Sequence, residues 1–191
     1  MIDRAASDLD EAALYRICTA TAGSPTDDPE LLGHVYAGPY LRFEPDLVRV
    51  IADDHGVAGY VLGCLDTTAF AAALERDWWP ALRARYPEGS GTEADAGIIR
   101  MLHRPQVAPP DLLATHPSHL HIDLLDRVQG GGWGRRLIEW LCAALAERGS
   151  RGVHLGVWSG NANAIGFYRH VGFRDHAVDG STLLMVRDLH R

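Results

Sequence analysis

Residues 129–134, Gln-Gly-Gly-Gly-Trp-Gly, have the types and spacing to bind an anion. They stand between a predicted strand and a predicted helix. A glycine-rich turn at such a junction exposes main-chain N–H groups that have no intrahelical partner, and the helix dipole adds partial positive charge. Because glycine lacks a Cβ, a phosphate can come within hydrogen-bonding distance of these groups. A plain turn needs only one or two glycines, so this run predicts an anion site.

The common nucleotide-binding motifs do not explain these glycines. The chain has no G-x-x-x-x-G-K-[ST] string, which excludes a P-loop. A dinucleotide fingerprint through Gly130 and Gly132 would place its last glycine at Arg135, and no acid ends the next predicted strand near residue 155. The anion is therefore expected to belong to another kind of ligand.

A second chemical pattern precedes the glycines, in the predicted strand of residues 119–125, HLHIDLL. Side chains alternate between the two faces of a strand, so His119, His121 and Asp123 share one face. A carboxylate there could attract a cationic amine and accept its proton, and an imidazole could do the same. We therefore name Asp123 and His121 as candidate general bases. The plainer interpretation is a partly solvated sheet face with structural histidines, and a β-bulge would change which face each residue occupies.

The same strand permits a metal site as an alternative. His119, His121 and Asp123, with His116 upstream, resemble the ligand spacing of metal-dependent hydrolases. The hydrolase motif continues with a second histidine after the aspartate, where this chain has Leu124. No further His or Cys cluster in the sequence completes a ligand shell, so we expect no metal.

The predicted elements place these residues around a β-α-β unit. Strand 119–125 leads through the glycine turn into a helix over 134–148, followed by a strand over 153–158 and a helix over 162–170. The remaining elements are predicted as a helix over 7–19, a strand hairpin within 47–65, a helix over 67–86 broken at Pro80, mostly loop over 87–117 with a short apolar piece at 98–102, and a strand over 182–189.

The sequence resembles the GCN5-related N-acetyltransferases, the GNAT family, in two motifs. Residues 129–134 match the family's coenzyme A loop, [RQ]-x-x-G-x-[GA]. Residues 155–173, LGVWSGNANAIGFYRHVGF, are similar to the family's L-x-V-x-x-x-N-x-x-A-I-x-x-Y-x-x-x-G-F in both type and spacing. The matching positions are Leu155, Val157, Asn161, Ala164, Ile165, Tyr168, Gly172 and Phe173.

The resemblance implies an α/β (α+β) fold with a mixed central β-sheet flanked by helices and the cofactor in a splay between two parallel strands. It implies a single domain over residues 1–191, with a long insertion at about 67–117 before the cofactor strand. A narrower likeness, to the acetyltransferase-like domain of O-GlcNAc hydrolases and its free-standing bacterial relatives, is carried by residues 36–41 (YAGPYL), the stretch from 65 to 87, and the 119–125 strand.

For function, the resemblance implies an N-acetyltransferase that moves an acetyl group from acetyl-CoA to an amine by direct attack on the thioester. Tyr168 matches the phenol that acts as general acid at the leaving sulfur, and Asn161 matches a contact to the pantetheine arm. The residues implied in cofactor binding are Ile122, Asp123, Leu124, Gln129, Gly130, Gly131, Gly132, Trp133, Gly134, Asn161 and Tyr168.

Two alternatives to an active acetyltransferase stay open at this stage. One is a catalytically inactive module that binds acetyl-CoA or a partner, and the other is the metal-dependent hydrolase described above. For Tyr168 the plainer interpretation is a core aromatic with its hydroxyl satisfied locally, and for Asn161 it is a helix cap. Aromatic residues expected on the acceptor side of the cleft are Tyr36, Tyr40, Trp78 and Trp79.

Composition narrows the partners. A formal net charge of -7 argues against nucleic acid and agrees with a cationic amine, either a small molecule or a peptide. Cys18, Cys64 and Cys142 are scattered singly, as in reduced proteins, and no stretch predicts a membrane span or a leader, so a cytoplasmic location is expected. The sequence leaves a homo-oligomer open.

Overall fold

The centre of the protein is a seven-stranded sheet with strand order β1-β2-β3-β4-β5-β7-β6. The computed structural model describes residues 1–24 and 26–189. β4 and β5 run parallel, and every other neighbouring pair is antiparallel. The strands are β1 (Ile2–Ala5), β2 (Val48–Asp53), β3 (Gly56–Cys64), β4 (Ser118–Leu124), β5 (Gly152–Trp158), β6 (Arg174–Asp179) and β7 (Thr182–Asp188). This mixed sheet confirms the predicted fold class.

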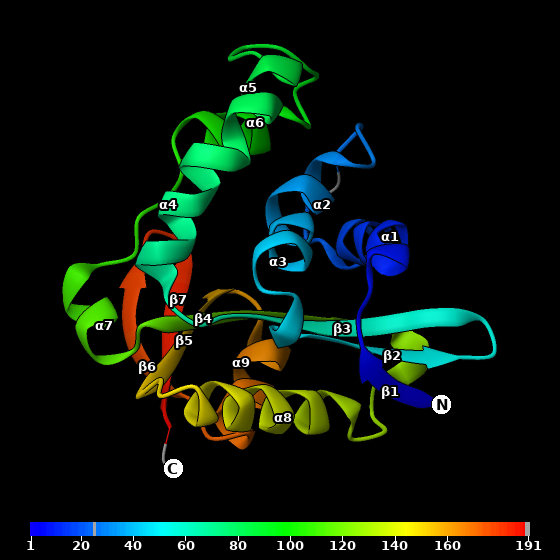
Figure 1. Ribbon diagram of the computed structural model, residues 1–191, viewed down its shortest axis with the longest axis vertical. Coiled ribbons are helices and arrows are strands. Elements are labelled where there is room, and N and C mark those ends of the chain that lie inside the picture. The colour runs from blue at the N-terminus through cyan, green and yellow to red at the C-terminus, as the bar shows by residue number, and fades with distance from the viewer. Residues whose placement is uncertain (25, 190–191) are drawn as a thin grey trace.

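Helices cover both faces of the sheet (Figure 1). One face carries α1 (Glu11–Thr21), α2 (Leu31–Tyr36) and α3 (Gly38–Phe43), and the other carries α8 (Trp133–Glu147) and α9 (Ala162–His170). The region predicted as an insertion forms α4 (Thr67–Asp77), α5 (Trp79–Arg85), α6 (Ala96–His103) and α7 (Pro110–Thr115). Short 3₁₀ turns at Asp8–Asp10, Pro45–Leu47 and Asp126–Val128 complete the elements.

Successive side chains of β3 and β4 point to opposite faces of the sheet, so their hydrophobic residues are divided between two cores. Tyr60 and Leu62 of β3 pack in the core that contains α1, α2 and the insertion helices. Val61 of β3 and Leu120 of β4 point the other way, into the core built on Leu137 and the rest of α8. Each strand therefore buries both faces, and polar side chains on β3 or β4 stand out as exceptions.

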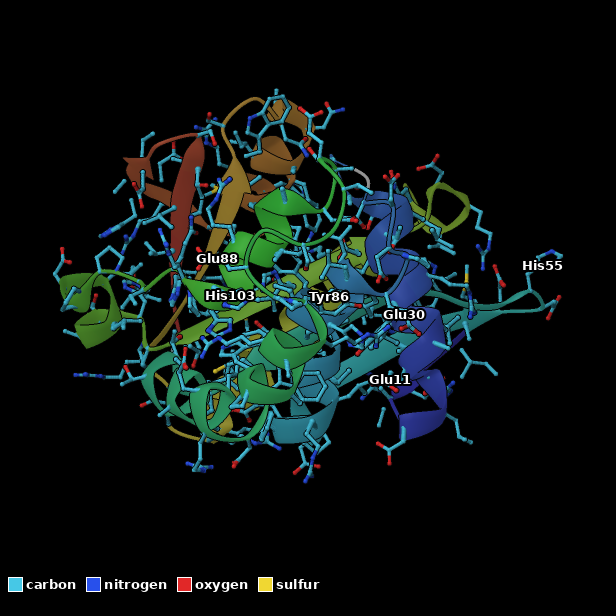
Figure 2. All side chains as sticks on the ribbon, turned by 90° about the horizontal axis from the view of Figure 1, so that it is seen from above. Glu11, Glu30, His55, Tyr86, Glu88 and His103 are labelled. Atoms are coloured by element: carbon cyan, nitrogen blue, oxygen red, sulfur yellow. The ribbon has the colours of Figure 1, made fainter. Side chains whose placement is uncertain are left out.

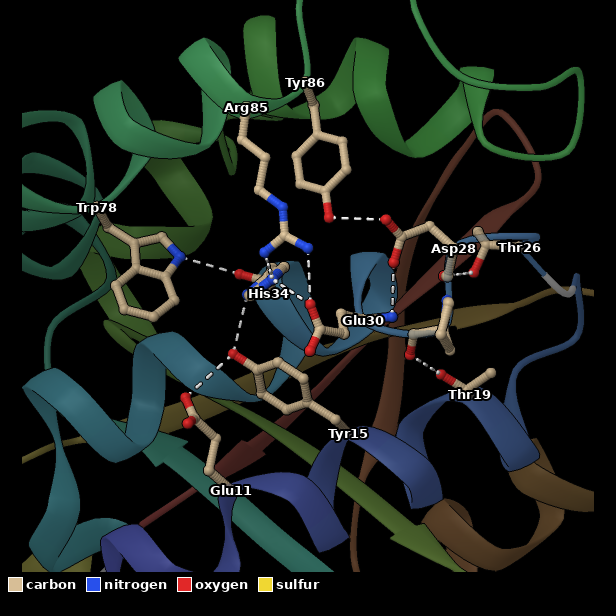
Figure 3. Close-up of polar contacts among 11 residues, drawn as sticks. Glu11, Tyr15, Thr19, Thr26, Asp28, Glu30, His34, Trp78, Arg85 and Tyr86 are labelled. Atoms are coloured by element: carbon tan, nitrogen blue, oxygen red, sulfur yellow. Dashed lines mark hydrogen bonds and ion pairs between the residues drawn. The ribbon is translucent and has the colours of Figure 1, made fainter.

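The insertion helices contact α2 and the residues just before it through a polar cluster, to which Tyr15 of α1 is joined at His34 (Figure 3). The guanidinium of Arg85 binds a carboxylate oxygen of Glu30 at 2.7 Å and Nε2 of His34 at 3.1 Å. The Tyr86 hydroxyl donates to Asp28 at 2.9 Å, and the Trp78 indole donates to the carbonyl of His34 at 2.9 Å. Seen from above, Tyr86 and Glu30 lie close together, while His55 projects from the distant tip of the β2–β3 hairpin (Figure 2).

The long elements agree with their predicted positions. Asn161 precedes α9 as its cap, and Pro80 stands at the start of α5, where the predicted helix breaks. Gly56 has a φ of 98° in the hairpin between β2 and β3.

Several short elements differ from the sequence-based prediction. Strands β1 and β6 were not predicted, because their side chains are mostly exposed and so lack a hydrophobic pattern. Residues 22–46, for which no helix was predicted, contain α2 and α3, and residues 87–117, predicted as mostly loop with an apolar piece at 98–102, contain α6 and α7. The longest of these four helices has 8 residues. Such helices are too short to show a clear period, and tertiary packing stabilises them. No helix among the described residues combines the length and apolar character needed to cross a bilayer.

Candidate active site

The sheet opens between its parallel strands. β4 and β5 pair at Ser118 with Val153 and at His119 with His154, and the register goes no further. Beyond that point β4 continues beside β3 as far as Leu124, while β5 continues beside β7. The facing edges of the two strands therefore leave backbone groups free for a ligand, as the splay in the predicted fold requires.

A cleft of about 1060 Å³ lies at this opening. The end of β4, the glycine turn, the start of α8 and one side of α9 form its walls, together with the end of α1. The predicted residues that line it are Ile122, Asp123, Leu124, Gln129, Gly130, Gly132, Trp133, Gly134, Asn161 and Tyr168. Gly131 lies in the same turn without lining the cleft, and His121 lies in a neighbouring cavity.

The glycine turn presents open main-chain donors to this cleft. Gly130 and Gly132 have φ values of 73° and 78°, which an L side chain rarely adopts, and Gly132 caps the N-terminus of α8. Within the described part of the chain, the backbone N–H groups from Gly130 to Arg135 have no hydrogen-bond partner. Successive free amides at a helix N-terminus form a concave binding site for an anion.

Neighbouring side chains hold the turn and add positive charge. The amide of Gln129 donates to the carbonyl of Leu124 at 2.8 Å, which fastens the turn to the end of β4. The guanidinium of Arg136 lies over the indole ring of Trp133, with its central carbon 5.3 Å from the ring centre. Arg135 lines the cleft, is exposed, and makes no ion pair with any described residue.

Two residues of the second motif reach the cleft from α9. Asn161 Oδ1 accepts a hydrogen bond from the amide of Ala164 at 3.0 Å, so the side chain caps α9 as well as lining the cleft. Tyr168 packs against Phe167 and Phe173, but its hydroxyl makes no hydrogen bond to any described residue. Burial, followed by the nearby charge of Asp123, raises the pKa of Tyr168, so the phenol keeps its proton at neutral pH.

Asp123 faces α1 and accepts a hydrogen bond from the hydroxyl of Tyr60 at 2.5 Å. Burial raises the pKa of Asp123, and the hydroxyls of Tyr60 and Thr21 oppose this effect. Sequence reasoning missed Tyr60, although the predicted hairpin places it on a strand that could neighbour the 119–125 strand. The pairing register, Tyr60 opposite Asp123, was needed to find it.

The histidines of β4 have different environments. His119 is engaged at both ring nitrogens, with the hydroxyl of Tyr40 at 2.7 Å and the hydroxyl of Thr67 at 2.7 Å. His121 contacts Tyr36 through ring edges and lines a second cavity beside Asp123. Burial, followed by the charge of His154, lowers the pKa of His121 to about 4, so its imidazole is neutral at neutral pH.

These contacts bear on two sequence-based expectations. The nitrogens of His119 are already occupied, which argues against the hydrolase alternative, and no group of three or more potential ligand side chains suited to a metal is found among the described residues. Of the aromatic residues expected around the acceptor, Tyr36 lines the second cavity. Tyr40, Trp78 and Trp79 instead pack in or against the core of α1 and the insertion helices.

Two of the known proteins similar to this chain are the rat (Rattus norvegicus) and mouse (Mus musculus) Protein O-GlcNAcase. Each is 28% identical over 172 residues, which cover 85% of this chain and 19% of the relative. The chain thus spans about a fifth of the length of these curated relatives. The match agrees with the narrower likeness drawn from the sequence motifs.

Solved structures share the fold across the whole chain. The crystal structure of SsHAT is 37% identical, with a TM-score of 0.91 and coverage of 100% of this chain and 98% of that one. A putative acetyltransferase, yncA from Salmonella typhimurium with its cofactor acetyl-CoA, has a TM-score of 0.58 at 16% identity, covering 100% of this chain and 95% of that one, and shows the fold alone. The model of the acetyltransferase (GNAT) family matches residues 24–173. With that match over most of its length, the chain belongs to the GNAT family.

Proposed function

We propose that this protein is an acetyl-CoA-dependent N-acetyltransferase and that residues 1–191 form one GNAT domain with an insertion at about 67–117. The observation that carries the proposal is the row of unpartnered amides from Gly130 to Arg135 at the mouth of the β4–β5 opening. Any helix leaves its first N–H groups without an intrahelical partner, but here no side chain caps α8 at Gly132, and the free amides of Gly130 and Gly131 extend the row into the turn. A diphosphate satisfies them with charge-assisted hydrogen bonds.

The residues of the cleft fit acetyl-CoA along its length. Residues 129–134 bind the diphosphate, and Arg135 adds a cation beside it. The backbone of β4 at Ile122 and Leu124 pairs with the amide-bearing arm, and Asn161 contacts the arm from the opposite side. When bound, acetyl-CoA supplies the activated acetyl group at the inner end of the cleft.

The remaining side chains handle protons. Asp123 attracts the acceptor's ammonium group and takes a proton from it, with His121 beside it as a further acceptor. Tyr168 keeps its proton at neutral pH because of burial, and it donates this proton to the leaving sulfur. Tyr60 holds the Asp123 carboxylate in place. We propose a small-molecule or peptide amine as the acceptor and a cytoplasmic setting.

Calorimetry with acetyl-CoA tests the proposal directly. We expect measurable heat with a stoichiometry of one site per chain, followed by release of free thiol when an amine is added. An inactive module would show the heat without thiol release. Absence of heat would contradict both cofactor binding and the function built on it.

A further inference from the structure

A second cavity, of about 290 Å³, adjoins the cofactor cleft. The two share Thr21 and Asp123 in their walls, so they meet at the carboxylate proposed to receive the acceptor's proton. A molecule seated in the smaller cavity can reach Asp123 without entering the space proposed for acetyl-CoA. This arrangement separates a second ligand from the first.

The walls of the small cavity come from segments that are distant in the sequence. The end of α1 and the loop after it form one side, and α2, α6 and β4 form the others. Helix α6 belongs to the insertion, so the insertion completes the cavity. The lining residues are Cys18, Thr21, Ala22, Gly23, Ser24, Leu32, Tyr36, Ile98, His121 and Asp123.

The charges of these walls select for one positive group. Asp123 supplies the carboxylate, and among the described residues neither a lysine nor an arginine lines the cavity. His121 contributes a neutral imidazole at neutral pH. An ammonium group therefore finds a partner at Asp123, whereas a carboxylate or phosphate on the ligand finds no cation. A second ammonium group finds no second acid in the wall.

The volume and the polarity of the small cavity also limit which amine can bind there. Ligand pockets for drug-sized molecules run from about 300 to 1,000 Å³, so this cavity lies at the small end. Leu32, Tyr36 and Ile98 present apolar surface, and the hydroxyl of Tyr36 already donates to Met101 Sδ at 3.2 Å. Besides Asp123 and Tyr36, the polar side chains of the wall are Thr21, Ser24 and His121, and the hydroxyl of Thr21 already donates to the carbonyl of Ile17 at 2.8 Å. A polyhydroxylated amine would therefore lose more hydrogen bonds to water than these walls replace.

We propose, on the basis of the acetyltransferase function above, that the small cavity holds the acceptor, a primary amine on a short apolar stem with no second charge. A free alkylamine and a lysine side chain both have this chemistry. The stem lies against Leu32, Tyr36 and Ile98, and the nitrogen lies at Asp123, where the two cavities meet. Ile98 and Tyr36 thus determine specificity in this proposal.

The reaction balances with these groups. The ammonium group first loses a proton to Asp123, which passes it to solvent. The neutral nitrogen then forms a bond to the acetyl carbon while the bond from that carbon to sulfur breaks. Tyr168 gives its proton to the sulfur, and the second proton lost from nitrogen restores the phenol. The products are an N-substituted acetamide, free thiol and a solvent proton.

Thiol release with a set of amines tests the inference. We expect kcat/KM for n-pentylamine and 2-phenylethylamine to exceed that for putrescine and glucosamine by about 10- to 100-fold. Nα-acetyl-lysine methylamide distinguishes the two sources of the stem. A higher value than that of n-pentylamine indicates a lysine side chain, and a lower value indicates a free amine.

A substitution in the wall of the small cavity gives a second test, in which the same amines are compared between variant and wild type. Ile98 is half-buried at the edge of the core, so Ile98→Asp adds a second carboxylate to the wall at some cost in stability, and a thermal melt checks that the variant is folded. This variant should shift the preference toward putrescine by about 10-fold or more while acetyl-CoA binding stays unchanged. The control is Arg100→Ala, an exposed residue of the same helix outside the cavity, which should leave the preference unchanged.

The outcomes separate this inference from the function on which it rests. Calorimetry that detects no acetyl-CoA binding would overturn the function itself. Acetyl-CoA binding with equal or faster turnover of glucosamine or putrescine overturns the proposed acceptor class and leaves the acetyltransferase standing. An unchanged preference in Ile98→Asp overturns the assignment of the cavity. Binding without thiol release from any of these amines overturns the acetyltransferase function, and the proposed acceptor class with it.

Discussion

Tyr168 combines a packed ring with an unpaired hydroxyl. Its ring centre lies 5.4 Å from that of Phe167 and 5.8 Å from that of Phe173, while the hydroxyl has no hydrogen-bond partner among the described residues. A core tyrosine normally satisfies its hydroxyl. The plainer interpretation offered by the sequence, a locally satisfied core aromatic, therefore does not describe this residue.

Replacing Tyr168 by Phe tests the proposed acid. Because the hydroxyl makes no hydrogen bond with residues 1–24 or 26–189, the thermal midpoint should change little. Turnover should fall by about 10- to 1,000-fold, since the leaving sulfur loses its proton donor, while the dissociation constant for acetyl-CoA stays nearly constant. Steady-state kinetics and calorimetry on the same preparation measure both. Wild-type turnover in this variant would reject Tyr168 as the acid.

The sequence alone could not distinguish the environments of His119 and His121. The sequence places both on one face of a strand, and the structure confirms that face. It then separates them, because Tyr40 and Thr67 occupy the nitrogens of His119 while His121 opens on a cavity. Those partners come from α3 and α4, far away in the chain, so no local pattern could distinguish the two imidazoles.

At the scale of elements, the turn from β4 into α8 combines two requirements on the backbone. Gly132 has a left-handed φ, and in the described part of the chain no neighbouring atom lies within 4 Å of the position that a Cβ would take. A side chain there is strained by the backbone and projects into the open space of the cleft. Gly56, in the hairpin between β2 and β3, shares the left-handed φ and the open surroundings but lies far from the cleft.

Two variants, Gly132→Val and Gly56→Val, separate the effect of backbone strain from the effect of a side chain in the cleft. Each variant should lose about 1 to 2 kcal/mol of the free energy of unfolding, because valine in the left-handed region is strained. Only Gly132→Val should weaken acetyl-CoA, with a dissociation constant about tenfold or more higher, as expected when a charge-assisted hydrogen bond is lost. Chemical denaturation and calorimetry measure the two quantities. Equal cofactor affinity in both variants would remove the turn from the proposed site.

At the scale of the whole molecule, the insertion is joined to the first helices by a buried carboxylate. Asp95 Oδ1 accepts hydrogen bonds from the amides of Asp27 at 2.9 Å and Asp28 at 3.2 Å, and Oδ2 accepts from Thr92. Asp95 directly precedes α6, the helix that carries Ile98. The same contact therefore fixes the loop before α2 and one wall of the proposed acceptor cavity.

Asp95→Ala should lower the free energy of unfolding at pH 7 by about 1 to 3 kcal/mol, because the amides of Asp27, Asp28 and Thr92 lose a charged acceptor. Burial alone would raise the pKa of Asp95, but the hydrogen bonds from Asp28 and Thr92 hold it below its usual value. This stabilisation is therefore fully present above the unfolded-state pKa of about 3.9 and is lost as the pH falls through the lower folded-state pKa.

Urea denaturation at neutral and acidic pH checks the prediction for Asp95. The difference in free energy of unfolding between wild type and Asp95→Ala should become smaller as the pH drops below about 4. Asp111→Ala, an exposed carboxylate whose side chain makes no hydrogen bond or ion pair with the described residues, is the matched control and should stay within about 0.5 kcal/mol of wild type. If the difference in free energy of unfolding between wild type and Asp95→Ala became larger at acidic pH, the lowered folded-state pKa of Asp95 would be contradicted.

The resemblance to the GNAT family implied the fold class, while the residues themselves predicted the β-α-β unit with its glycine turn and the helix that follows Asn161. The β-α-β unit and that helix are encoded locally, because glycine conformations, capping side chains and hydrophobic periods act over a few residues. The tertiary structure decided which residues meet: Tyr60 at Asp123, Tyr40 at His119, and Ile98 at the second cavity. Such contacts depend on strand register and on how distant helices pack, and the packed molecule alone supplies that information.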